Sequence, residues 1–166
     1  MKKLRRAACL LLTALLCALT LWPADATAVE LPITSRAALL MEKTTGQILY
    51  AQNEHEQLEP ASVTKVMTLL LTMEAIDSGT IRYDDVVTVS AAAAGMGGSQ
   101  VFLAEGEQIT VEELLKAVCV ASGNDAAVAL AEKVAGVHEL FVEQMNRRAA
   151  ELGMERSEER RVGKEC

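Results

Sequence analysis

Histidine and cysteine are scarce in this 166-residue chain, which contains 2 of the first and 4 of the second. Neither histidine has the companion histidine or cysteine that zinc-ligand spacing requires. Two cysteines lie within the first 17 residues and one is the last residue, so only Cys119 remains in the body of the chain. We therefore predict no metal site and no disulfide framework. Cys119 lies in the apolar run 114–121 and is expected to be a small buried hydrophobic residue.

Basic residues are also in short supply. Residues 30–155 carry 8 basic and 19 acidic side chains, a net charge of −11. A basic stripe is the usual mark of a nucleic-acid-binding protein, and anionic lipid also attracts lysine and arginine. We therefore expect no nucleic acid partner and no direct adhesion of this region to an anionic membrane.

Several well-known catalytic and binding patterns are missing. The glycines form neither G-x-x-x-x-G-K-[ST] nor G-x-G-x-x-G, so no phosphate-cradling loop is predicted. No G-x-S-x-G elbow is present, and neither histidine lies in a sequence context typical of a Ser-His-Asp hydrolase.

The first 28 residues have the three parts of a secretory signal peptide. Four basic residues within the first six precede the apolar run 7–22, and the stretch Ala-Asp-Ala-Thr-Ala then offers cleavage after Ala26 or Ala28. The apolar run is short for a membrane-spanning helix. We therefore expect residues 1–28 to be removed from an exported protein, located at the outer face of the cytoplasmic membrane or in the periplasm.

Residues 29–155 are predicted to form one domain or part of one, containing both strands and helices. The short apolar runs 37–41 and 47–51 flank Gly46 and predict a β-hairpin. A short strand is expected at 86–89. Helices are predicted at four places: about 62–78, 110–121, 125–134 and 137–152. The second of these begins with a capping box, Thr110–Glu113. The first has apolar residues in nearly every turn, so it is expected to be buried on most of its circumference.

Ser62 and Lys65 lie at the start of the first predicted helix, three residues apart. Pro60 precedes this helix and Gly79 follows it, so Ser62 is expected in or near the N-cap. The spacing places the serine hydroxyl and the lysine amine on one face. A serine becomes a good nucleophile when a base takes its proton, and an amine can do this when burial or a helix dipole keeps it neutral. The simpler alternative is a capping serine followed by a surface lysine.

A second motif, Ser122-Gly123-Asn124, lies in the turn between two predicted helices. A serine hydroxyl and an asparagine amide presented from one turn can relay a proton and hold a substrate amide. The alternative is again helix capping, with the serine at a C-terminus and the asparagine at an N-terminus.

These two motifs, in this order after a signal peptide, make the sequence resemble the penicillin-recognising serine enzymes. The resemblance is strongest to the D-alanyl-D-alanine carboxypeptidases, which are low-molecular-weight penicillin-binding proteins. It covers nearly all of residues 33–154, including Gly97-Gly98-Ser99-Gln100. It implies an α/β (α+β) fold of the β-lactamase/transpeptidase-like type, with an antiparallel sheet and a helical subdomain around the Ser122–Asn124 turn.

The resemblance also implies a role for each motif residue. Ser62 would be the acylated nucleophile, with its backbone N–H as an oxyanion-hole donor, and Lys65 the proton acceptor. Ser122 would relay a proton and Asn124 would bind substrate. The implied substrates are peptidoglycan stem peptides, which lose the terminal D-alanine through an ester on Ser62. β-Lactams would acylate the same serine as covalent inhibitors, and no metal or organic cofactor is implied.

Two alternatives share this resemblance. A class A β-lactamase should carry S-D-N and a later E-x-x-L-N, whereas this chain has glycine at position 123 and a stretch at 143–146 that is one residue too short. The other alternative is a non-catalytic cell-wall binding protein of the same fold. The presence of all four residues, Ser62, Lys65, Ser122 and Asn124, argues against it.

The sequence departs from the family in lacking a K-[ST]-G motif after Asn124. Residues 156–166 also abandon the apolar pattern and resemble the translation of a common sequencing adapter. We therefore expect residues 29–155 to be the N-terminal part of a carboxypeptidase catalytic domain and residues 156–166 to be a foreign tail. Membrane association is expected only through a C-terminal anchor, which this sequence does not contain. The chain as written is expected to be poorly stable and inactive or nearly so.

Overall fold

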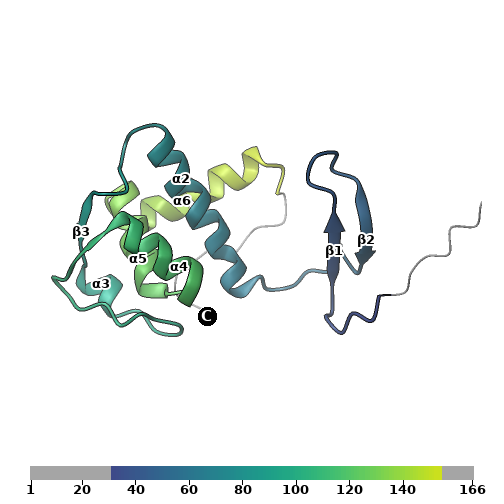
Figure 1. The fold of residues 1–166 in the computed structure, drawn as a ribbon, viewed down its shortest axis with the longest axis horizontal. Coiled ribbons are helices and arrows are strands. Elements are labelled where there is room, and N and C mark those ends of the chain that lie inside the picture. The colour runs from purple at the N-terminus through teal and green to yellow at the C-terminus, as the bar shows by residue number, and fades with distance from the viewer. Residues whose placement is uncertain (1–30, 155–166) are drawn as a thin grey trace, which may run out of the picture. The chain divides into compact units, whose positions relative to one another are not determined.

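The computed structural model describes residues 31–154, which divide into two compact units separated after Gln57. The predicted signal peptide and the predicted foreign tail lie outside the described residues. The first unit contains strands β1 (Ala38–Met41) and β2 (Ile48–Gln52), which pair antiparallel (Figure 1). The predicted hairpin is therefore confirmed.

The hairpin turn is stabilised by one acidic side chain. Glu42 accepts hydrogen bonds from the backbone N–H groups of Thr44 and Thr45 at 2.9 and 2.6 Å and from the Thr45 hydroxyl at 2.7 Å. These bonds, led by that of the hydroxyl, lower the pKa of Glu42 to about 2. Gly46 has a φ of 71°, a conformation that glycine adopts without steric cost, and this lets the chain reverse.

The strands of the hairpin expose much apolar surface. Five large side chains are each more than half exposed: Leu39, Leu40, Met41, Ile48 and Leu49. Within residues 31–154, no third strand joins this sheet. An isolated two-stranded hairpin is only marginally stable in water, so the stability of the described chain comes from its second unit.

The second unit is mainly helical (Figure 1). It contains, in chain order, the 3₁₀ helix η1 (Ala61–Thr64), α2 (Lys65–Asp77), β3 (Val86–Thr88), α3 (Ala91–Ala94), β4 (Gln108–Thr110), α4 (Val111–Ala121), α5 (Asn124–Ala135) and α6 (His138–Glu151). Strands β3 and β4 pair antiparallel. Helix α5 packs against α2, α3, α4, α6 and β3, and its residues 124–131 are all buried. This helix is rich in alanine, so neighbours can approach closely from several sides.

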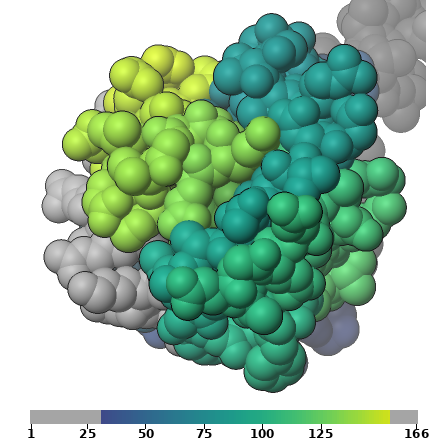
Figure 2. All heavy atoms as spheres, turned by 90° about the vertical axis from the view of Figure 1, so that its left-hand side faces the viewer, coloured from purple at the N-terminus to yellow at the C-terminus, as the bar shows by residue number. Residues whose placement is uncertain are grey.

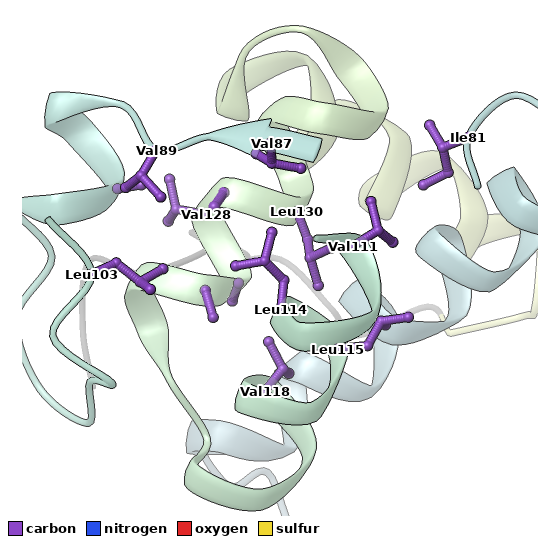
Figure 3. Packing of buried hydrophobic residues seen from close by; sticks show 14 residues of the cluster. Ile81, Val87, Val89, Leu103, Val111, Leu114, Leu115, Val118, Val128 and Leu130 are labelled. Atoms are coloured by element: carbon purple, nitrogen blue, oxygen red, sulfur yellow. The ribbon is translucent and has the colours of Figure 1, made fainter. Parts of the chain in front are cut away.

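The core of the second unit forms around α4 and α5 (Figure 3). On α4, Val111, Leu114 and Val118 recur at intervals of three and four residues and are buried, as expected of one helix face. They meet Val128 and Leu130 of α5. Each such side chain contributes about 1.5–3 kcal/mol of hydrophobic stabilisation when fully buried.

Helix α6 completes the unit through a second cluster. Phe141 and Met145, one turn apart on α6, pack with Leu71 of α2 and Ala131 of α5. Figure 2 shows the end of α6, in yellow, lying against the teal side chains of the α2 region. The Arg148 guanidinium joins the same two helices through Glu74, with N–O distances of 2.8 and 3.0 Å.

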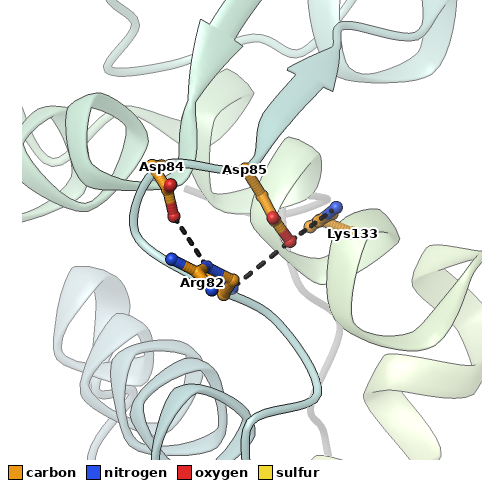
Figure 4. Close-up of polar contacts among 4 residues, drawn as sticks. All are labelled: Arg82, Asp84, Asp85 and Lys133. Atoms are coloured by element: carbon orange, nitrogen blue, oxygen red, sulfur yellow. Dashed lines mark hydrogen bonds and ion pairs between the residues drawn. The ribbon is translucent and has the colours of Figure 1, made fainter.

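A polar cluster connects the start of β3 to α5 (Figure 4). Lys133 Nζ lies 3.0 Å from Asp85 Oδ2, and the Arg82 backbone N–H donates to the same oxygen at 3.2 Å. Both contacts, that of Lys133 foremost, hold the pKa of Asp85 below its usual 3.8. The Arg82 side chain itself pairs with Asp84 at 3.0 Å.

The predicted helices and the capping box at Thr110–Glu113 are confirmed. The short elements α3 and β4 were not predicted. The expectation that residues 62–78 are buried on most sides is wrong, because only one stripe of α2 packs on α5 and α6. The expected burial of Cys119 is also wrong: it is exposed, because α4 turns toward the core the face that carries Val118.

Candidate active site

The chain enters α2 through a tight turn that contains Ser62. Pro60 has helical dihedral angles, and Ala61, which follows it, has a φ of 45°. Ser62 therefore lies inside η1, and α2 begins at Lys65 with Thr64 as its N-cap. Ser62 was expected in or near the N-cap, and it lies near it, two residues before Thr64, because a 3₁₀ turn precedes the α-helix.

Ala61 occupies a conformation that is uncommon for a residue with a side chain. A positive φ costs a non-glycine residue roughly 1–2 kcal/mol, and it persists only where the surrounding structure enforces it. Such residues concentrate at functional sites. Here the strained residue directly precedes the candidate nucleophile Ser62.

The Ser62–Lys65 pair forms as predicted. Lys65 Nζ donates a long hydrogen bond of 3.4 Å to Ser62 Oγ. Ser62 is exposed, whereas Lys65 is only 9% exposed and begins the buried stripe of α2. An accessible hydroxyl next to a buried amine is the arrangement that an activated serine requires. Bonds of this kind are often long before substrate binds.

Ser122 ends α4 in the left-handed conformation, with φ 55° and ψ 37°. Its backbone N–H donates to Val118 O at 3.1 Å, and the N–H of Gly123 donates to Ala117 O at 3.3 Å. Gly123 is then the N-cap of α5, and Asn124 is the first residue of that helix. The turn therefore leads directly from α4 into α5, with Ser122 and Asn124 on either side of Gly123.

Asn124 is 2% exposed and is tied to a distant part of the chain. Its Nδ2 donates to Gly97 O at 2.7 Å, and its backbone N–H donates to Ser99 O at 2.7 Å. Among residues 31–154, no hydrogen bond joins Asn124 to Lys65. The structure therefore forms the Ser62–Lys65 pair, places Ser122 and Asn124 in one turn, and brings α2, which begins with Lys65, into contact with α5, which begins with Asn124.

The sequence analysis did not identify Asp125, the residue after Asn124, as part of the site. Asp125 is 1% exposed, and its carboxylate accepts hydrogen bonds from the backbone N–H groups of Val101 at 3.1–3.2 Å, Leu103 at 3.1 Å and Ala126 at 2.9 Å. The sequence gives a weak signal for this, since an acidic residue in the first turn of a helix is common for another reason, the helix dipole.

Packing explains why position 123 is occupied by glycine. A Cβ at Gly123 would lie 2.8 Å from Asp125 Oδ1, 3.4 Å from the Ala126 Cβ and 3.6 Å from the Val101 Cγ1. The first distance is shorter than real Cβ contacts, so any side chain at position 123 displaces the Asp125 carboxylate. The S-D-N pattern of a class A β-lactamase therefore does not fit this turn as it stands.

Residues 31–154 contain no group of three or more His, Cys, Asp or Glu arranged to hold a metal ion. In that same part of the chain, no helix has both the length and the apolar character needed to cross a membrane.

Comparison with known proteins agrees with the fold and the motifs. The family profile described as D-alanyl-D-alanine carboxypeptidase, peptidase S11, matches residues 24–161, a range that includes the first six residues of the expected foreign tail. The chain is 53% identical over 125 residues to the D-alanyl-D-alanine carboxypeptidase DacF of Bacillus subtilis, a match that covers 75% of this chain and 32% of the relative. It is 48% identical over 120 residues to DacD of Escherichia coli, covering 69% and 31%.

Solved structures give the same result. The D-alanyl-D-alanine carboxypeptidase DacD from Francisella tularensis superposes with a TM-score of 0.77 at 31% identity, covering 82% of this chain and 33% of that one. Penicillin-binding protein 6B from Escherichia coli gives 0.68 at 45% identity, covering 75% and 42%. The arrangement is thus that of a penicillin-binding protein.

The chain belongs to the D-alanyl-D-alanine carboxypeptidase family, the S11 peptidases. It spans about a third of the length of the curated relatives it matches. The predicted family and the predicted α/β fold class are both confirmed.

Proposed function

We propose that this chain supplies the acylating residues of a serine-type D-Ala-D-Ala carboxypeptidase that acts on peptidoglycan stem peptides outside the cytoplasmic membrane. The observation that carries the proposal is the Ser62–Lys65 pair, an exposed hydroxyl 3.4 Å from a buried amine, in a member of the family. The predicted signal peptide supports the extracytoplasmic location.

The reaction proceeds in two steps. Ser62 Oγ attacks the carbonyl carbon between the two terminal D-alanines, and Lys65 Nζ takes its proton. The C–N bond then breaks, Ser122 passes a proton to the departing D-alanine amine, and the shortened peptide remains as an ester on Ser62. Water hydrolyses the ester and restores the hydroxyl. No metal or organic cofactor takes part.

Asn124 has a defined part in this scheme. Its Nδ2 uses one of its two N–H groups on Gly97 O at 2.7 Å, and its carboxamide oxygen is the acceptor proposed to hold the substrate amide or Lys65. A β-lactam carries a reactive carbonyl and would acylate Ser62 in the same way. One relative, penicillin-binding protein D2 from Listeria monocytogenes, has been solved in an ampicillin-bound form.

The proposal is tested by intact-mass spectrometry after incubation with a penicillin. Two samples are needed: this chain, and a chimera in which residues 29–154 replace the corresponding part of the Bacillus subtilis relative. We expect a stoichiometric adduct on Ser62 that is lost in Ser62→Ala. Ser78→Ala is the matched control, since Ser78 is an exposed serine at the other end of α2 whose hydroxyl hydrogen-bonds only the nearby Ala75 carbonyl and Thr80 hydroxyl.

The outcomes separate the alternatives. A persistent adduct together with D-alanine release from a peptide ending in D-Ala-D-Ala supports the proposal. An adduct in the chimera alone would assign completion of the site to the rest of the domain. An adduct that hydrolyses within seconds, without D-alanine release, indicates a β-lactamase. No adduct in either sample contradicts the proposal and leaves the non-catalytic binding protein.

A further inference from the structure

The segment 97–103 is held in place by two consecutive residues of α5. Asn124 binds the carbonyl groups of Gly97 and Ser99, and Asp125 binds the N–H groups of Val101 and Leu103. Every second residue of this segment is therefore fixed to the start of α5. We call residues 97–103 the tethered segment.

The Asp125 carboxylate is an essential part of this arrangement rather than a solvated acid. It is 1% exposed, and burial of a carboxylate is costly unless hydrogen bonds replace its water. Three backbone N–H groups supply those bonds, from Val101, Leu103 and Ala126. Hydrogen bonds to an ionised group are roughly twice as strong as neutral ones. The tethered segment and Asp125 therefore stabilise each other.

Phe102 lies between the two residues that Asp125 binds. It has a φ of 61° and is 84% exposed, so its ring contributes little burial to offset the cost of this conformation. A bulky residue stays in the left-handed region only when its neighbours are held. The bonds to Val101 and Leu103 are what hold them. Loss of the Asp125 carboxylate would therefore let the tethered segment change conformation.

We propose that Asp125 is a positioning residue for the candidate active site. It fixes the tethered segment, and the tethered segment in turn holds Asn124 through Gly97 and Ser99. The Asn124 carboxamide then keeps the orientation in which its Nδ2 donates to the Gly97 carbonyl. The same contacts also position Ser122, because it belongs to the same turn. This inference rests on the proposed function of the Ser62 site.

The first test needs no activity. Hydrogen exchange of the Val101 and Leu103 amides is compared among the full chain, Asp125→Asn and Asp125→Ala. Met145→Ala is the control, since Met145 is fully buried in the α6 cluster and far in sequence from the segment. We expect exchange at both amides to rise about tenfold in Asp125→Ala and less in Asp125→Asn, which keeps one acceptor oxygen. Unchanged exchange at these amides overturns the inference.

The second test measures catalysis in whichever of the chain and the chimera forms the adduct. Small displacements of catalytic groups can cost up to about a hundredfold in rate. We therefore expect Asp125→Ala to slow penicillin acylation and D-alanine release about tenfold or more, chiefly through kcat rather than KM, with Asp125→Asn intermediate. Met145→Ala should lower the melting temperature without this loss of kcat.

The outcomes of the two tests are distinct. If the amides exchange faster but kcat matches that of Met145→Ala, Asp125 is a structural residue only and the positioning role is rejected. If the unmodified chain and chimera both form no adduct, the proposed function fails and the positioning role fails with it. The exchange data would then still decide whether Asp125 holds the tethered segment.

Discussion

Replacing Gly123 by alanine tests the packing of the Ser122–Asn124 turn directly. Gly123 has a φ of −61° and a ψ of 121°, which alanine adopts without strain, so the backbone itself accepts the change. The added Cβ would lie 2.8 Å from Asp125 Oδ1, however, and the carboxylate must move away. Its bonds to Val101 and Leu103 are 3.1–3.2 Å long, so a shift of about half an ångström would break at least one of them.

The magnitude follows from that broken bond. A hydrogen bond to a charged group contributes about 1.5–3 kcal/mol, so we expect Gly123→Ala to lower the free energy of unfolding by about 2 kcal/mol. For a unit of this size, that corresponds to a fall of about 10 °C in melting temperature. Gly97→Ala is the matched control: its Cβ would meet nothing within 4 Å, and Gly97 lies outside the left-handed region. It should change stability by less than about 0.5 kcal/mol.

The assay is urea and thermal unfolding followed by circular dichroism, with the two variants and the unmodified chain measured side by side. Equal midpoints for Gly123→Ala and Gly97→Ala would refute the reasoning. They would show that Asp125 can move without cost and that glycine at position 123 has no steric basis.

Two further predictions concern the second unit. Lys133→Met removes the main contact that holds the pKa of Asp85 below 3.8, so the stability that the pair contributes is present above pH 3.8 and is lost as the pH falls further. The difference in urea midpoint between the unmodified chain and this variant should accordingly shrink between pH 5 and pH 2.5, and a constant difference would contradict it. Cys119→Ser should change stability by less than about 0.5 kcal/mol, because the thiol is exposed, whereas a larger loss would restore the original expectation of burial.

The features predicted correctly from sequence are those set by local chemistry. The capping box of Thr110 and Glu113 is readable because both partners lie within four residues. Gly46 is readable because few other residues favour a positive φ. The Ser62–Lys65 pair follows from helical spacing alone, and its measured separation agrees with it.

The features that were missed depend on contacts between distant parts of the chain. The packing of α5 and α6 determines which face of α2 is buried. The buried face includes the polar residues Lys65, Thr68 and Thr72. Burial of this helix on most of its circumference would also have covered Val63 and Val66, and both are exposed. The role of Asp125 was likewise invisible, since its partner Val101 lies 24 residues earlier.

The contact between α2 and α5 determines when the candidate site comes into existence during folding. Ser62 and Lys65 are available as soon as the first turn of α2 is made, and Ser122 and Asn124 belong to a later stretch that organises itself over about two dozen residues. During synthesis Ser62 therefore leaves the ribosome well before the Ser122–Asn124 turn, which is its proposed partner in catalysis. The packing of α2 on α5, supported by α6, joins these two stretches. A chain in which α2 has not packed on these helices carries the candidate residues without the helix contacts that bring the two stretches together.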